Sequence, residues 1–138
     1  MSEEYPSALL EKYYMTNILL GKGGYGVVLL GKLRRNCCVE VAVKILDTAR
    51  LSRRFSRTIF KAKDVEKEVA IMLQINHPNC VKFMDWIEAD KRAYIVMEKV
   101  DGGELFDRII DPKWNGMGFG EDLCKFYAWQ LLSAVEVR

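Results

Sequence analysis

The pattern of hydrophobic and polar positions predicts that the first two thirds of the chain consist mainly of strands. Apolar, β-branched runs bounded by glycine, asparagine or charged turns are typical of strands. We expect strands at Met15–Leu20, Val27–Leu30, Val39–Leu46, Val81–Glu88 and Ala93–Met97. Residues 1–12 are expected to form a tail or a short helix, and the basic stretch 47–63 an irregular loop.

Helical periodicity appears after the third strand. Val65, Val69 and Met72 recur at helical spacing and predict a helix over Asp64–Ile75, which Asn76-His-Pro-Asn79 ends. Further helices are expected at Glu104–Ile110 and from Glu121 onward. Five strands with one helix after the third, followed by helices, predict an α+β fold in which an antiparallel sheet carries one packed helix.

Composition changes this picture little. The 138 residues fit one domain, 50% are hydrophobic, and a net charge of +2 gives no reason to expect nucleic acid as a partner. No apolar run reaches the ~18 residues of a membrane span, and the acidic N-terminus is not a signal peptide. The spacing of four cysteines and the single histidine predicts no metal site. Reduced thiols are typical of an intracellular protein of the cytoplasm or nucleus.

The segment Gly21-Lys-Gly23-Gly24-Tyr-Gly26 is the first candidate for chemistry, because glycines let a backbone approach phosphates closely. In a dinucleotide-binding fold such a segment must open a helix. Here the β-forming run from Val27 follows directly, which favours a strand–loop–strand flap over nucleotide phosphates. An ordinary hairpin turn is the third interpretation.

The run Val41-Ala42-Val43-Lys44 follows on an expected strand. Alternation places Ala42 and Lys44 on one face and the two valines on the other, toward a core. A small alanine beside a lysine leaves room for a flat base while the ammonium reaches phosphates. A half-buried strand with one solvated lysine is the alternative.

The lysine would need an anionic partner. Glu68 shares a helix face with Met72 and Ile75, the face expected to point inward, whereas Glu66 falls elsewhere. We therefore expect Glu68 to pair with Lys44 and hold the ammonium against phosphate oxygens. A surface carboxylate of small effect is the alternative interpretation.

A third constellation spans Tyr94 to Glu104, where a buried strand passes into a short extended segment. Exposed backbone groups between apolar walls read adenine well. Glu104 opens a helix and could accept a hydrogen bond from a ribose hydroxyl, although a carboxylate there also suits the helix dipole.

These segments together resemble the eukaryotic protein kinase domain from about Tyr14 to Glu136. Within that family the chain is most similar to calcium/calmodulin-dependent-group serine/threonine kinases, and among these to checkpoint kinases that carry a forkhead-associated domain. Gly102-Gly-Glu-Leu-Phe-Asp107, the spacing of Lys44 and Glu68, and Cys124-Lys-Phe-Tyr127 carry this similarity. The glycine segment is also similar to that of ribosomal S6 kinases.

The resemblance implies a layout of an N-terminal tail at 1–13, an N-lobe at 14–97, a hinge at 98–103 and the start of a helical C-lobe at 104–138. It implies that Val28 and Ala42 sandwich adenine, that Met97 is the gatekeeper, and that Met72 and Phe83 belong to a regulatory hydrophobic spine. The implied ATP-contacting residues are Leu20, Gly21, Gly23, Gly24, Gly26, Val28, Ala42, Lys44, Met97, Glu98, Val100 and Glu104.

The resemblance breaks at the C-terminal end. Family members continue past Glu136 to His-Arg-Asp and Asp-Phe-Gly, which supply the catalytic aspartate and the Mg²⁺ ligands, and neither triplet occurs here. We therefore expect a chain that holds ATP but does not transfer phosphate to a protein substrate, which the complete domain would do. A short, non-catalytic binding or regulatory product is the alternative.

Overall fold

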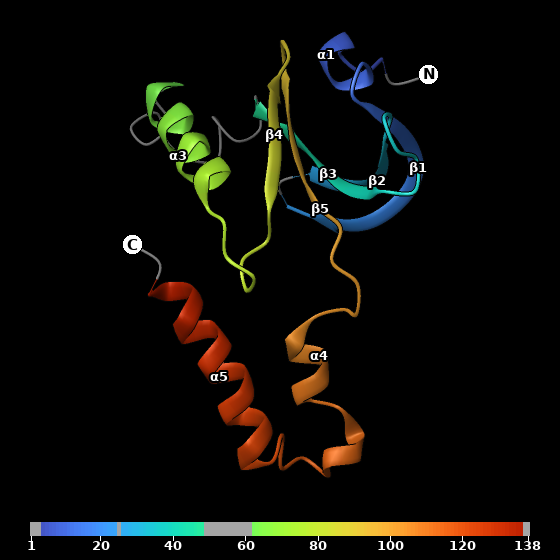
Figure 1. Ribbon diagram of the computed structural model, residues 1–138. Helices are drawn as coiled ribbons and strands as arrows, with labels where there is room; N and C mark the ends of the chain where they lie inside the picture. Colours follow the sequence, from blue (N-terminus) through green and yellow to red (C-terminus); the bar gives the residue numbers. More distant parts are fainter. Residues whose placement is uncertain (1–3, 25, 49–61, 137–138) are drawn as a thin grey trace. The chain divides into compact units, whose positions relative to one another are not determined.

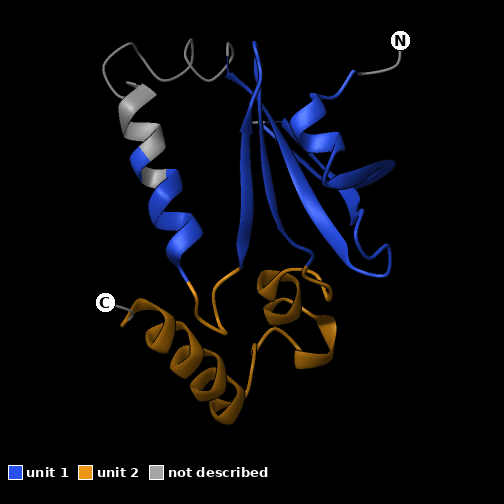
Figure 2. Cartoon of the chain, turned by 45° about the horizontal axis from the view of Figure 1, so that its top comes forward, with its two compact units in different colours: residues 1–75, 82–99 blue, residues 76–81, 100–138 orange. Residues whose placement is uncertain are grey.

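The computed structural model describes the backbone of residues 4–24, 26–48 and 62–136. Within residues 62–68, it describes the side chain of Lys67 only. The elements, in chain order, are α1 (Ser7–Leu10), β1 (Tyr13–Gly23), β2 (Gly26–Leu33), β3 (Glu40–Asp47), α3 (Ala62–Gln74), β4 (Phe83–Glu88), β5 (Arg92–Glu98), α4 (Leu105–Ile109), the 3-10 helix η1 (Pro112–Trp114) and α5 (Glu121–Val135) (Figure 1). They fall into two compact units, residues 1–75 with 82–99 and residues 76–81 with 100–138 (Figure 2).

The first unit is built on one five-stranded antiparallel sheet in the order β1-β2-β3-β5-β4. β3 therefore lies at the centre, and β1 and β4 form the two edges. The α+β class and the five antiparallel strands with one inserted helix are confirmed. Because Gly26 opens a strand and not a helix, the dinucleotide-binding interpretation is wrong.

The hydrophobic core lies on one face of this sheet. Val41, Val43 and Ile45 alternate along β3, and they are 0%, 0% and 6% exposed. Tyr94 and Val96 of β5 complete the same layer. The expectation that the valines of β3 point into a core is confirmed, since alternate residues of a strand share a face.

The N-terminal segment covers this core face. Leu9 of α1 and Tyr13 at the start of β1 are almost completely buried, and the ring of Tyr5 meets the ring of Tyr94 edge-to-face with centroids 6.2 Å apart. A short helix was one of the two forms expected for residues 1–12. We did not predict from the sequence that this helix contributes to the core.

Helix α3 packs against the opposite face. A small cavity there is lined from α3 by Val69, Met72 and Leu73, and from the sheet by Phe83, Asp85, Trp86 and Ile95. Figure 1 shows α3 beside β4, on the other side from α1. The sheet is thus sandwiched between a packed helix and the N-terminal segment.

The structure corrects the bounds of the expected strands, most of all around the glycines: β1 runs on to Gly23, and β2 ends at Leu33, three residues later than Leu30. The glycine segment is largely paired and not a free loop, because the ladder runs through Gly21↔Val28 to Gly23↔Gly26. β4 begins at Phe83, two residues later than Val81. Most of the basic stretch 47–63 lies outside the described residues.

The second unit joins the loop after α3 to α5. The Asn79 backbone N–H donates to His77 Nδ1 (3.0 Å), and the Asn79 side-chain amide donates to the Gln130 carbonyl (3.1 Å). His77 Nε2 lies 3.3 Å from Ser133 Oγ. Polar contacts therefore hold the Asn-His-Pro-Asn turn to the last helix.

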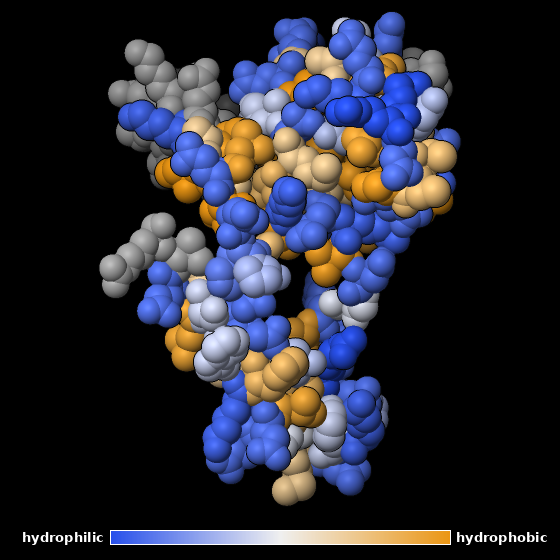
Figure 3. Space-filling model, in the orientation of Figure 1, coloured by the Kyte–Doolittle hydropathy of each residue, from blue (hydrophilic) through white to orange (hydrophobic). Residues whose placement is uncertain are grey.

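Aromatic packing organises the rest of this unit. Phe119 stacks on Tyr127 with centroids 5.3 Å apart and receives Trp114 edge-on at 5.8 Å. Five large apolar side chains of α5 are nevertheless more than half exposed, namely Phe126, Trp129, Leu131, Leu132 and Val135. Hydrophobic residues accordingly reach the surface of this unit in the space-filling view (Figure 3).

Candidate functional site

The register of the sheet brings several candidate residues onto the face opposite the core. Val28 pairs with Lys44, and Ala42 pairs with Met97. Directly paired residues, and residues two positions apart, project from the same face of a sheet. Val28, Ala42, Lys44 and Met97 therefore share one face, which is the face that α3 covers farther along. We call these four residues the β-face row.

The glycine hairpin lies at one end of this row. Gly21 pairs with Val28, and Leu20 falls in the irregularity between Leu19 and Gly21. Gly26 has φ 147°, and a Cβ there would come within 1.9 Å of the Ile45 carbonyl oxygen. The fold itself thus requires glycine at position 26.

The other glycines of the hairpin have a different setting. A Cβ added at Gly23 would meet no atom within 4 Å, and Gly24 at the tip is exposed. The packing of the chain therefore does not demand glycine at position 23. Open space above the backbone at this position is what a close-approaching ligand would use.

Lys44 is half-buried on β3, directly opposite Val28 and Ile95. The side chain of its expected partner, Glu68, lies outside the described residues, as does that of Glu66. The pairing of Lys44 with Glu68 therefore stays a prediction. The backbone position of Glu68 is within α3, the helix that packs on the same sheet face.

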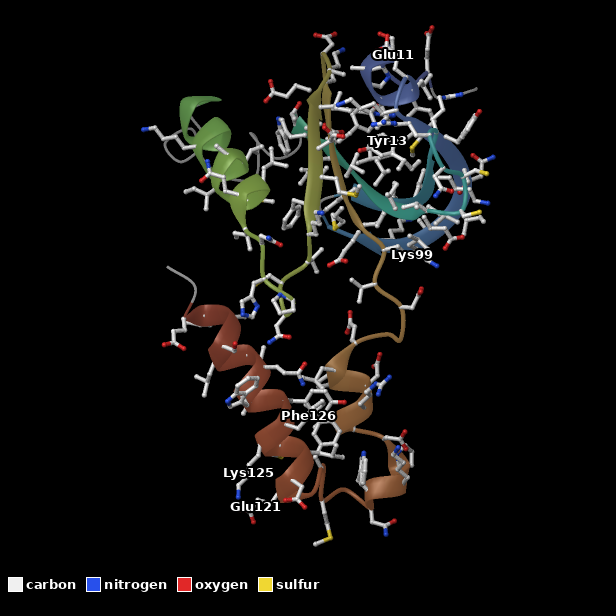
Figure 4. The ribbon with its side chains drawn as sticks, viewed as in Figure 1. Glu11, Tyr13, Lys99, Glu121, Lys125 and Phe126 are labelled. Atoms are coloured by element: carbon white, nitrogen blue, oxygen red, sulfur yellow. The ribbon has the colours of Figure 1, made fainter. Side chains whose placement is uncertain are left out.

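The end of β5 is fixed by contacts on both sides. The Glu98 backbone N–H donates to the Lys82 carbonyl (2.9 Å), and Glu98 Oε1 accepts from the Lys82 backbone N–H (3.0 Å). Lys99, the next residue, forms an ion pair with Glu40 at the start of β3 (2.9 Å; Lys99 is labelled in Figure 4). These contacts hold the strand end in register beside β3.

Val100 and Glu104 belong to the second unit. Val100 is exposed, with 65% of its surface accessible. Glu104 is the N-cap residue of α4, has an extended backbone, and makes no capping hydrogen bond with its side chain. The Glu104 carboxylate is therefore exposed at a helix start without serving as a hydrogen-bonding cap.

The two residues that the resemblance assigns to a hydrophobic spine lie on either side of the packing between α3 and the sheet. Met72 of α3 and Phe83 of β4 line the same small cavity. Phe83 pairs with Met97, which places it at the end of the β-face row. An apolar connection therefore runs from the helix to the row.

Sequence reasoning missed one polar contact near the sheet edges. The Tyr13 hydroxyl donates a hydrogen bond to Asp85 of β4, and Lys12 Nζ lies 3.2 Å from the same carboxylate. Burial, and then the hydrogen bond and charge of Asp85, raise the pKa of Tyr13 above its ordinary value. The spacing of Tyr5, Leu9 and Tyr13, four residues apart, was the available signal that this segment packs on the core.

The described residues contain no group of three or more His, Cys, Asp or Glu side chains arranged to hold a metal ion. None of the described helices is long and apolar enough to cross a membrane.

Comparison with known proteins identifies the family. The family model described as "Protein kinase domain" matches residues 14–137. The serine/threonine-protein kinase chk-2 of Caenorhabditis elegans is 45% identical over 97% of this chain, and the ovarian-specific serine/threonine-protein kinase Lok of Drosophila melanogaster is 35% identical over 92%. The chain spans only 28% and 26% of the lengths of these two relatives.

A solved structure supports the same fold. The crystal structure of Rad53 1-466 in complex with AMP-PNP superposes with a TM-score of 0.71 at 24% identity, covering 92% of this chain and 30% of that one. A strand–glycine hairpin–strand unit, a central lysine strand and a packed helix are common to the kinase fold and to the first unit described above. The chain belongs to the protein kinase family and is similar to its serine/threonine checkpoint kinases.

Proposed function

We propose that this chain is the ATP-binding portion of a serine/threonine kinase domain. One observation carries the proposal, namely that Val28, Ala42, Lys44 and Met97 come from three strands yet share one sheet face beside the glycine hairpin. Such a face offers apolar contact for a flat base and one ammonium for phosphates. The Rad53 structure is a complex with AMP-PNP, and this supports the same ligand chemistry here.

The individual roles follow from chemistry and position. Val28 and Ala42 contact the adenine, and Met97 limits the depth of the base site. Lys44 binds α- and β-phosphate oxygens, and Glu68 orients the Lys44 ammonium. The glycine hairpin covers the phosphates, with the open position at Gly23 allowing close approach of the backbone.

The residues after β5 complete the nucleotide contacts in this proposal. Because the Glu98 N–H already donates to Lys82, Glu98 contributes its carbonyl to adenine. Val100 contributes backbone groups. Glu104, whose side chain makes no capping hydrogen bond, accepts from a ribose hydroxyl.

Phosphoryl transfer needs more than a bound nucleotide. Mg²⁺ on the β- and γ-phosphates and a carboxylate that orients the attacking hydroxyl are also required. The described residues contain no group of three or more His, Cys, Asp or Glu side chains that could hold a metal ion, so we assign no Mg²⁺ ligands to them. We propose that a 138-residue polypeptide of this sequence binds ATP weakly and does not phosphorylate a protein substrate, and that its cellular setting is intracellular, which four free cysteines favour.

The test is nucleotide binding measured by titration calorimetry on the purified chain. Lys44→Met should weaken ATP binding by roughly 10–100-fold, since a hydrogen bond to a charged group contributes about 1.5–3 kcal/mol. Lys91→Met, in the exposed turn between β4 and β5, is the matched control and should bind as the parent does. Equal binding by the Lys44→Met variant would contradict the assignment of the face.

A second measurement tests transfer. A generic serine peptide should gain only background amounts of labelled phosphate from ATP, equally with the parent chain, with Lys44→Met and in a blank without protein. Transfer by the parent above the Lys44→Met background would refute the inactivity proposal while leaving ATP binding intact.

A further inference from the structure

The turn between β2 and β3 carries two adjacent cysteines at its tip. The Leu33 N–H donates to the Val39 carbonyl (2.9 Å), which closes the hairpin, and the Val39 N–H donates to the Asn36 carbonyl (3.0 Å). Asn36–Val39 is therefore a four-residue β-turn whose two central residues are Cys37 and Cys38. Neither cysteine has a positive φ, as in a type I turn.

Further contacts hold the backbone of this turn in place. Asn36 Oδ1 accepts from the Cys38 N–H (3.1 Å), which is an Asx turn. On the preceding side, Arg34 donates through Nε to the Leu10 carbonyl (2.7 Å) and covers the Tyr14 ring with its guanidinium carbon 3.8 Å from the centroid. The two cysteines are thus displayed on an anchored turn.

The thiols themselves are available for binding. Both cysteines are free and exposed. Their Cα atoms are separated by one trans peptide, about 3.8 Å, so rotation about the side-chain bonds lets both sulfurs reach one atom between them. Two thiol sulfurs side by side form a soft, bidentate donor set.

A set of only two sulfur donors also limits which class of ligand the turn can bind. A structural zinc ion takes four ligands, and no group of three or more His, Cys, Asp or Glu in the described part of the chain could hold a metal. A trivalent arsenic atom that already carries one carbon substituent needs only two sulfurs to complete its three bonds. Two adjacent exposed thiols satisfy that requirement.

We propose that Cys37 and Cys38 form a vicinal dithiol site that captures trivalent organoarsenicals. In the reaction with an arsenoxide, two As–S bonds form and the arsenic–oxygen bond breaks. The two thiol protons leave with the oxygen as one water molecule, and no electron transfer is needed. The product is a ring closed across the turn.

The site is separate from the proposed nucleotide contacts. The glycine hairpin and the cysteine turn lie at opposite ends of β2, since Gly23 pairs with Gly26 at one end and Leu33 pairs with Tyr13 at the other. Occupation of the dithiol should therefore leave the affinity for ATP unchanged. Nucleotide titration and arsenical binding then report on independent sites.

The experiment treats the full chain with phenylarsine oxide and measures its intact mass. We expect one phenylarsenic group per chain, resistant to a monothiol and removed by a dithiol. Trypsin cleavage after Arg35 and Lys44 should place the group on the peptide Asn36–Lys44, which contains both cysteines.

Variants make the assignment specific. Cys37→Ser and Cys38→Ser should each weaken arsenical binding at least tenfold. With one thiol left, the arsenic forms a single As–S bond and loses the second bond, which the high effective concentration of the adjacent thiol favours. The Cys80→Ser/Cys124→Ser double variant should bind as the parent does. Retention of the adduct in Cys37→Ser, or its mapping to a peptide other than Asn36–Lys44 in the parent, would overturn the proposal.

Discussion

The hydroxyl of Tyr13 donates a hydrogen bond to the carboxylate of Asp85, and this contact joins the two edge strands of the sheet. Tyr13 begins β1, and Asp85 lies within β4. Because β1 and β4 are separated by three other strands in the sheet, the bond links two residues that no strand pairing brings together. Figure 4 labels Tyr13 beneath α1.

Replacing Tyr13 with Phe should destabilise the first unit by about 1.5–3 kcal/mol near neutral pH, the usual contribution of a hydrogen bond to a charged acceptor. Urea unfolding measures this change. Tyr14→Phe is the control, since the Tyr14 ring is 47% exposed. A loss below about 0.5 kcal/mol would show that the bond has little energetic effect.

The pH dependence of the same variant has a definite sign. The folded chain holds the pKa of Tyr13 above its unfolded value. The stabilisation is therefore complete below pH ~10 and is lost as the pH rises toward the folded pKa. Tyr13→Phe should lose less stability than the parent between neutral and strongly alkaline pH, and an unchanged slope would contradict this.

Core packing gives the next prediction. Val43 is fully buried in the centre of β3, so Val43→Ala should cost about 2–3 kcal/mol through lost transfer energy and a residual cavity. Val39→Ala, at a position 39% exposed, should cost less than about 0.5 kcal/mol. Denaturant unfolding followed by tryptophan fluorescence measures both, and equal costs would argue against this core.

The two paired glycines of the hairpin should respond differently to one methyl group. Gly26→Ala places a Cβ against the Ile45 carbonyl and forces a strained φ, so the melting temperature should fall by several degrees. Gly23→Ala meets open space and should melt as the parent does, while ATP affinity falls. A stable Gly26→Ala chain, or full ATP affinity in Gly23→Ala, would count against the respective role.

The turn at Asn79 offers a test of the second unit. Asn79→Ala removes the hydrogen bond from the side-chain amide to the Gln130 carbonyl and should lower the local free energy of unfolding by about 1 kcal/mol. Amide hydrogen exchange along α5 should accelerate. Asn17→Ala, at an exposed position of β1, should leave α5 exchange unchanged, and faster exchange in both variants would mean a global effect.

Alternation and glycine spacing were sufficient to predict the central sheet. The β-branched run of β3 predicted which valines face the core and that Lys44 faces the other way, because successive side chains of a strand point to opposite faces. The strand order was not contained in any local pattern. It depends on which segments pair, and those partners are distant in sequence.

The candidate site was only partly accessible to such reasoning. The placement of Val28, Ala42 and Met97 on one face depends on the register of three strands, which the sequence of a single segment does not contain. Around Leu9 the only signal was the four-residue spacing of Tyr5, Leu9 and Tyr13, and three positions do not establish a helical period. The bond between Tyr13 and Asp85 links residues 72 positions apart and leaves no trace in either neighbourhood.

Because side chains alternate along β3, substitutions at neighbouring positions from 41 to 45 should affect either folding or ligand binding. Positions 41, 43 and 45 project into the core, whereas 42 and 44 project from the opposite face. A saturation scan should therefore give abundance defects at the three odd positions and normally expressed, ligand-deficient chains at Lys44, whereas Ala42, only 8% exposed, should show both effects. Selection acting on folding and selection acting on ligand use can then change neighbouring residues almost independently.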